Sequence, residues 1–83
     1  MPEEKVGVVT HYFGHIHVAA VKLEKPLKVG DTIHVKGHTS DFTQTVDSLQ
    51  LEHQDVDAGS PGEEVALRVV EHARQHDDVF RVT

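Results

Sequence analysis

The feature that most constrains the fold is the alternation of apolar and polar residues in short segments between turns. In PLKVGDTIHVKG, residues 26–37, Ile33 and Val35 alternate with polar neighbours between two glycines. In residues 46–67 a second apolar pattern runs into an acidic turn containing glycine and proline, after which the alternation resumes. A period of two puts every second side chain on the same face of a strand. The chain is therefore expected to form strands that each bury one face.

Strand patterns of this kind occur six times, separated by turns rich in Gly, Pro and Asp. They span residues 5–11, 16–23, 32–36, 42–53, 63–70 and 79–82. Six short strands favour a closed barrel, because closure removes exposed sheet edges. One turn of helix is expected at 71–75. We predict an all-β fold, a small closed six-stranded antiparallel-type β-barrel, as a single domain in residues 5–83 after a loose N-terminus at 1–4.

The predicted core collects the apolar residue of each strand that shares a face with its apolar neighbours. Its members are Val6, either Val8 or Val9, Ile16, Val18, Ala20, Leu23, Leu27, Ile33, Val35, Val46, Leu49, Leu51, Val65, Leu67, Val69 and Val79. The choice between Val8 and Val9 stays open at this point.

Length and composition limit the class of protein. Eighty-three residues supply one domain with one core. The chain has no cysteine, which excludes disulfides and thiolate metal sites. It has no apolar run near the length of a membrane span, and no secretory signal pattern. We expect a soluble cytoplasmic protein that does not bind membranes.

The formal charge of −6 is distributed unevenly along the chain. Up to residue 38 the sequence has five lysines and four acidic residues, whereas from residue 39 onward it has three arginines and ten acidic residues. The acidic second part argues against unspecific affinity for nucleic acid, which depends on cations that neutralise phosphates. A local RNA contact through lysines such as Lys22 and Lys36 remains open, beside the alternative that these are solvated surface charges.

The sequence shows no catalytic constellation. A phosphate-binding loop of the form GxxxxGK[ST] does not occur, so nucleotide binding and hydrolysis are not expected. The acids Asp55, Asp57, Glu63 and Glu64 flank turns and form no recognisable acid and base pair. We therefore predict that the chain is not an enzyme.

Eight histidines are a high number for a chain of this length. His11, His15 and His17 surround the first predicted hairpin, where three imidazoles would suit a divalent transition metal such as zinc, nickel or copper. His72 and His76 have the i, i+4 spacing that shares one side of a helix. The favoured interpretation is surface histidines without a bound cofactor, and a histidine-based metal-binding protein is a distant third hypothesis for function.

Four segments carry a resemblance to a known family, and they lie within residues 6–82. They are LKVGDTIHVKG, VDSLQLEHQDV, SPGEEVALRV and HARQHDDVFRV. In this order they resemble the second, β-barrel domain of translational GTPases of the elongation factor Tu type. His76 stands where the family's ending has a glycine. The resemblance implies a pocket for the aminoacyl end of charged tRNA, with Val18, Gln50, Leu67 and Arg68 at the corresponding ligand-binding positions.

Two functions from different classes follow. The first is a translation elongation factor-like binding module without GTPase activity, which contacts RNA, a ribosomal component or a partner protein. Its predicted interaction surface consists of Tyr12, Phe13, His15, His17, Lys22 and Lys36. The alternative is an accessory or recognition subunit of a separately encoded enzyme, U32 peptidase-like or RNA-modifying, because similar barrels occur fused to catalytic domains such as the U32 peptidase-like family.

Overall fold

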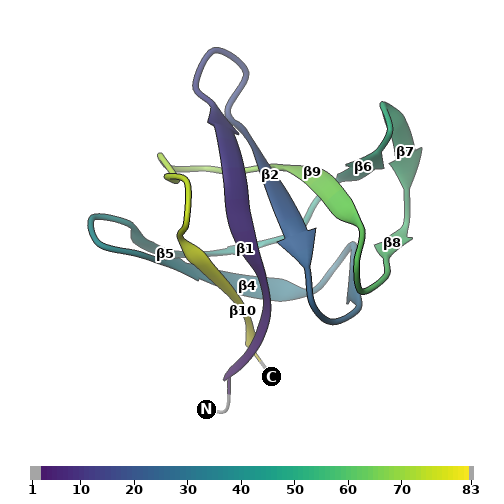
Figure 1. Cartoon of the computed structure of the whole chain (residues 1–83), viewed down its shortest axis with the longest axis horizontal. Helices are drawn as coiled ribbons and strands as arrows, with labels where there is room; N and C mark the ends of the chain where they lie inside the picture. Colours follow the sequence, from purple (N-terminus) through teal and green to yellow (C-terminus); the bar gives the residue numbers. More distant parts are fainter. Residues whose placement is uncertain (1–2, 83) are drawn as a thin grey trace.

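A computed structural model describes residues 3–82 of the chain, which contain ten β-strands (Figure 1). The strands are β1 (Glu3–Phe13), β2 (Val18–Leu23), β3 (Leu27–Lys28), β4 (Thr32–Lys36), β5 (Asp41–Thr45), β6 (Leu49–Leu51), β7 (Gln54–Val56), β8 (Ala58–Gly59), β9 (Glu64–Arg68) and β10 (Asp78–Val82). Strand β1 begins inside the segment predicted to be a loose terminus, since Glu3 and Glu4 pair with Val82 and Arg81. Residues 1 and 2 of that segment lie outside the described residues.

The strands pair in two antiparallel sheets. The large sheet has the order β5-β4-β10-β1-β2-β9-β6-β7, and β3 pairs with β8 in a second sheet of two strands. The prediction of an all-β fold is confirmed. The prediction of six strands closed into a barrel is not supported, because the large sheet ends at β5 and β7 and neither sheet closes on itself within residues 3–82.

The predicted long strand at 42–53 is divided into β5 and β6. Between them Val46 turns into the core, and its N–H donates to Asp31 O while its own carbonyl accepts from Gly30 N–H. These two bonds tie the chain to the turn before β4, so the ladder of β5 cannot continue into β6. The predicted helical turn at 71–75 is absent, because bends and irregular backbone occupy that segment.

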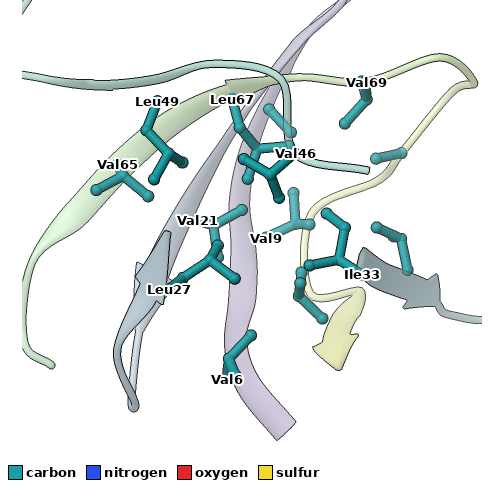
Figure 2. Packing of buried hydrophobic residues seen from close by; sticks show 14 of the residues in the cluster. Val6, Val9, Val21, Leu27, Ile33, Val46, Leu49, Val65, Leu67 and Val69 are labelled. Atoms are coloured by element: carbon teal, nitrogen blue, oxygen red, sulfur yellow. The ribbon is translucent and has the colours of Figure 1, made fainter. Parts of the chain in front are cut away.

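The core lies where the apolar faces of the strands meet, as Figure 2 shows for Val9, Val21 and Leu67 among others. Val9, at 0% exposure, resolves the choice left open with Val8. In the second strand the prediction is only partly right. Ala20 and Leu23 are buried as predicted, but Ala19 and Val21 are buried as well, Val18 is half-buried, and Ile16 is 62% exposed. The reason is that residues 14–17 form a turn, so β2 starts only at Val18.

Two hairpins frame one end of the sheet. The loop between β1 and β2 projects beyond the rest of the molecule at the top of Figure 1, while the β6–β7 hairpin stands at the right with β9 between it and β2. The β6–β7 turn places Glu52 and His53 at φ values of 52° and 66°. Two successive residues with positive φ are the mark of a type I′ turn, which joins two strands by two residues.

No helix in the described part of the chain has the length and apolar character that a membrane span requires.

Candidate binding grooves

A groove opens where β6 separates from β9. The two strands pair at Leu49 with Leu67 and at Gln50 with Ala66, and the ladder stops there. Beyond this point the chain of β6 continues through Leu51 into the β6–β7 turn, while β9 runs back toward Glu64. The space between them, which we call the larger groove, has a volume of about 740 Å³.

The larger groove has an apolar floor and an acidic rim. Its floor contains Ala20 from β2, Val65 and Ala66 from β9 and the half-buried Leu51 from β6. The more exposed lining residues are Phe13, Gln50, Glu52, His53, Gly62, Glu63 and Glu64. An apolar surface bordered by a few polar groups is the usual composition of a binding site.

Two of the rim carboxylates are positioned by hydrogen bonds. Glu63 Oε1 accepts from the backbone N–H of Ser60 at 2.7 Å, which fixes the turn before β9. The Thr10 hydroxyl donates to Glu64 Oε2 at 2.6 Å, across β2 from the neighbouring strand β1. Neither Glu63, Glu64 nor Glu52 forms an ion pair with a Lys, Arg or His side chain of residues 3–82. The rim therefore keeps its negative charge uncompensated.

A second, smaller depression adjoins the larger groove, with a volume of about 240 Å³. It is lined by Ile16, Val18, Ser48, Gln50, Ala66, Leu67 and Arg68. All four predicted ligand-binding residues, Val18, Gln50, Leu67 and Arg68, thus come together from three strands. Gln50 and Ala66 line both hollows, so the two form one continuous surface.

Gln50 stands at the junction of the two hollows with its side chain oriented by β7. Its Nε2 donates to Asp55 Oδ1 at 3.0 Å, between residues that are cross-strand partners in the β6–β7 hairpin. The amide oxygen makes no hydrogen bond to another described residue. Gln50 can therefore accept a hydrogen bond from a bound group without giving up its contact to Asp55.

The predicted interaction surface is only partly contiguous. Phe13, His15 and His17 lie at the β1–β2 hairpin, and Phe13 is 47% exposed. Tyr12 is half-buried and its ring lies 4.4 Å from that of His72. Lys22 and Lys36 are on β2 and β4, which β1 and β10 separate. The hairpin thus presents an exposed apolar tip, while the two lysines belong to other parts of the surface.

The three histidines predicted as metal ligands are not brought together. His11 pairs with Ala20 in the β1–β2 ladder and its ring stacks near Phe13, at 6.1 Å between centroids. His15 and His17 lie in the turn at 14–17 and not on one strand face. Across residues 3–82, no group of three or more His, Cys, Asp or Glu side chains is arranged to hold a metal ion.

Several charged side chains form ion pairs on another part of the sheet. His34 on β4 contacts Glu3 through Nδ1 at 2.9 Å and Asp41 through Nε2 at 2.5 Å. The hydrogen bond to Asp41 is the main cause that raises the pKa of His34 above its ordinary value; burial opposes it, and the hydrogen bond to Glu3 adds to the rise. Hydrogen bonding to Lys25 is the main cause that lowers the pKa of Glu4, with Arg81 adding to it. These pairs join β1, β4, β5, β10 and the connection between β2 and β3, and they lie outside both grooves.

Sequence reasoning noted Glu63 and Glu64 but placed them at turns without convergence, and it did not consider Glu52. The structure brings all three to one groove because β6 and β9 are antiparallel neighbours whose far ends diverge. The available signal was the pair of acidic turns at the two ends of the segment between β6 and β9. Fold and grooves together define a small all-β domain with two adjoining hollows on its surface.

Comparisons with known proteins show that the chain is similar to part of a protease. No protein-family model matches the chain. The chain is 32% identical over 77 residues to an uncharacterized protease of Methanocaldococcus jannaschii, an alignment that covers 92% of the chain and 19% of that protein. The chain thus spans about a fifth of the length of this relative.

Two solved structures share the fold. Both are of the C-terminal domain of a Geobacillus thermoleovorans protein assigned to the U32 peptidases. One has a TM-score of 0.90 and 22% identity, covering 96% of this chain and 93% of that domain. The other, a selenomethionine variant, has a TM-score of 0.87 and 23% identity, covering 92% and 96%. At these identities the match establishes the fold, which is that of the whole C-terminal domain.

These findings correct the resemblance to translation factors. The relative is a protease and the structural neighbours are U32 peptidase C-terminal domains, not the second domain of elongation factor Tu. The motifs that carried the resemblance are turns followed by alternating strands, which small all-β domains of different families share. The predictions of a translation elongation factor-like protein and of a β-barrel are therefore wrong for this chain.

Proposed function

We propose that this chain is a non-catalytic accessory module of a U32 peptidase-like enzyme, to which it contributes a binding surface. The observation that carries the proposal is the relative: 92% of the chain aligns at 32% identity with a protease about five times its length. The near-complete overlap with a C-terminal domain of a protein assigned to the U32 peptidases supports the same role. This was the alternative that the sequence offered to a translation-related module.

The proposal of a non-catalytic role is supported by the chemistry of the candidate site. The chain has no cysteine. The rim carboxylates Glu63 and Glu64 are engaged with Ser60 N–H and with Thr10, as expected of groups that shape a surface. A peptidase also needs a positioned nucleophile, a metal-bound water or two carboxyl groups that share a proton. In the described residues neither groove is lined by a histidine that contacts a serine or threonine hydroxyl, and the rim carboxylates form no hydrogen bond with one another. The reaction is assigned to the partner enzyme.

The partner is proposed to be protein rather than RNA. The exposed apolar groups of the β1–β2 hairpin, Phe13 and Ile16, suit the centre of a protein interface. The adjoining rim is acidic, and carboxylates repel the phosphates that dominate RNA affinity. The mixed surface is thus better matched to a polypeptide than to a nucleic acid.

The test is an affinity capture of the intact chain from lysate, divided into nuclease-treated and untreated halves, with identification of protein and RNA. We expect a nuclease-resistant complex with a protein that contains a U32 peptidase-like catalytic part. Co-expression of the two should then give a complex of defined stoichiometry. Recovery of only tRNA or ribosomal components, sensitive to nuclease, would refute the proposal, as would no enrichment of such an enzyme.

A further inference from the structure

We propose that the larger groove binds an extended segment of the partner enzyme in which basic and apolar side chains alternate. This inference rests on the proposed function, since it names the part of the enzyme that this module contacts. Three independent features carry it: the divergence of two paired strands, the separation of apolar floor from acidic rim, and the absence of compensating cations around that rim.

The shape of the groove suits a chain in extended conformation. The walls are β9 and the continuation of β6, which are held together at Gln50 and Ala66 and then separate. A volume of about 740 Å³ lies within the range of roughly 300–1,000 Å³ that is usual for ligand sites. The space thus follows the direction of a strand, and an inserted segment would lie between two existing strands, as in β-strand addition.

The distribution of polarity selects the side chains. In an extended segment successive side chains point to opposite sides. One set would face the floor of Ala20, Leu51 and Ala66, where apolar groups gain most from burial. The other set would point outward, where long cationic side chains reach the carboxylates of Glu52 and Glu64 on the rim.

The charge distribution of the whole chain supports a cationic occupant. The ion pairs among residues 3–82 involve Lys5, Lys25, His34 and Arg81, all on or beside β1, β4 and β10. The rim carboxylates lie outside this network. His53 is the one histidine of the lining, and Arg68 belongs to the smaller depression. A groove of net negative charge beside a compensated surface favours a basic partner segment and disfavours RNA.

The experiment uses the intact chain and four fluorescent probes of ten units each. The first peptide alternates arginine with leucine, the second replaces each arginine by glutamate, and the third replaces each leucine by serine. The fourth probe is a single-stranded RNA. Fluorescence anisotropy at several salt concentrations gives the affinity for each probe, and amide chemical shifts of the isotope-labelled chain locate the site.

We expect saturable binding of the arginine and leucine peptide, at least about tenfold tighter than that of the glutamate or serine peptide, weakening as salt rises. Shifts should concentrate at Leu51, Val65 and Ala66. The double variant Glu52→Lys/Glu64→Lys should lose about tenfold or more in affinity, since each exposed pair contributes about two- to fivefold and reversal adds repulsion. Glu71→Lys, an exposed acid outside both grooves, should leave the affinity unchanged.

Chemical shifts of the unmodified chain keep the test valid if the double variant does not fold. Equal binding of the glutamate peptide, preference for RNA, or shifts confined to another face would overturn the inference. The same arginine and leucine peptide is then added to the complex with the captured enzyme, where it should displace the module. If the peptide binds in the groove but no U32 peptidase-like protein is captured, the proposed function fails while the groove assignment stands. If the enzyme is captured but the peptide neither binds nor displaces it, the groove assignment fails alone.

Discussion

The carboxylate of Asp77 occupies the space beside Gly37 that any side chain at that position would need. A Cβ at Gly37 would lie 1.8 Å from Asp77 Oδ1 and 2.4 Å from its Cγ. Asp77 is held there, because it is only 4% exposed and its Oδ2 accepts a hydrogen bond from the Arg74 backbone N–H at 2.9 Å. We therefore expect Gly37→Ala to lower the free energy of unfolding by about 1–3 kcal/mol, as overpacking does in a filled site. Urea unfolding measures it.

Gly14→Ala is the matched control for this prediction. A Cβ at Gly14 would meet only the Tyr12 ring, at 3.5 Å, which is an ordinary contact. The change in unfolding free energy should stay within about 0.5 kcal/mol, as for most surface substitutions. Equal losses in the two variants would show that the Asp77 carboxylate is not the cause.

A substitution at His76 is expected to raise the free energy of unfolding, whereas Gly37→Ala lowers it. It precedes Asp77 with a φ of 77°, in the left-handed region that disfavours residues with a Cβ. We expect His76→Gly to raise the free energy of unfolding by up to about 1 kcal/mol, because the relief of strain exceeds the entropy that glycine loses on folding. His76→Ala, which removes the imidazole but keeps the Cβ, should give no such gain in thermal or urea unfolding. A similar gain in both variants would contradict the assignment to strain.

This position also shows what a local pattern can predict. The resemblance to translational GTPases proved wrong as a family assignment, but it placed His76 where that family's ending has a glycine, and the positive φ fits a glycine position. In the same way, alternation predicted the buried residues of β4, β9 and β10, namely Ile33, Val35, Val65, Leu67 and Val79. Where each strand is bounded by turns, period-two patterning suffices to choose the inward face.

The parts of the fold that the sequence did not predict depend on contacts between segments far apart in the chain. Alternation alone could not show that Val46 interrupts the strand at 42–53, because the cause is its pair of hydrogen bonds with Gly30 and Asp31. The two-residue strands β3 and β8 exist only through their mutual pairing. Whether the sheet closes is likewise decided by which strands become neighbours, and the order ends at β5 and β7.

The candidate site was predicted unevenly for the same reason. Gln50, Val18, Leu67 and Arg68 were selected through a family resemblance that proved wrong, yet they do line one depression. The reason is that β9 pairs with both β2 and β6, which brings positions on these three strands together. The acidic rim was missed, since the two acidic turns that supply it lie at one groove only because β6 and β9 pair and then diverge beyond Ala66.

The contacts of His34 predict a pH dependence of stability. Asp41 and Glu3 raise the pKa of His34 in the folded chain above the ordinary value of 6.5. The protonated form therefore stabilises the fold fully below pH 6.5, and this contribution is lost as the pH rises through the higher pKa of the folded state. The free energy of unfolding of the native chain should decrease as the pH rises from 6.5 through the higher pKa of the folded state, and the His34→Gln variant should not show this decrease.

The control for the pH dependence is His38→Gln, an exposed histidine of the β4–β5 turn. It should retain the decrease of the native chain. The pKa of His34 can be read directly from the titration of its ring protons by NMR. A value at or below the ordinary one would refute the prediction, as would a native profile that His34→Gln leaves unchanged.

Ile16 separates stability from binding. It is 62% exposed in the turn between β1 and β2 and lines the smaller depression. Because little apolar surface is buried there in the free chain, Ile16→Ser should change the unfolding free energy by no more than about 0.5 kcal/mol. If the hairpin contacts the partner enzyme, the same substitution should weaken the complex by about fivefold or more, as at an apolar contact that is buried on association.

Val70→Ser is the matched control for Ile16, because Val70 is 69% exposed but lines neither groove. Its substitution should change neither stability nor binding of the captured enzyme, measured by calorimetry or surface plasmon resonance. Equal weakening by both variants would indicate a general effect of surface polarity. Unchanged binding with Ile16→Ser would remove the hairpin from the interface and leave the larger groove as the contact, because the wall that β6 and β9 form around it does not depend on Ile16.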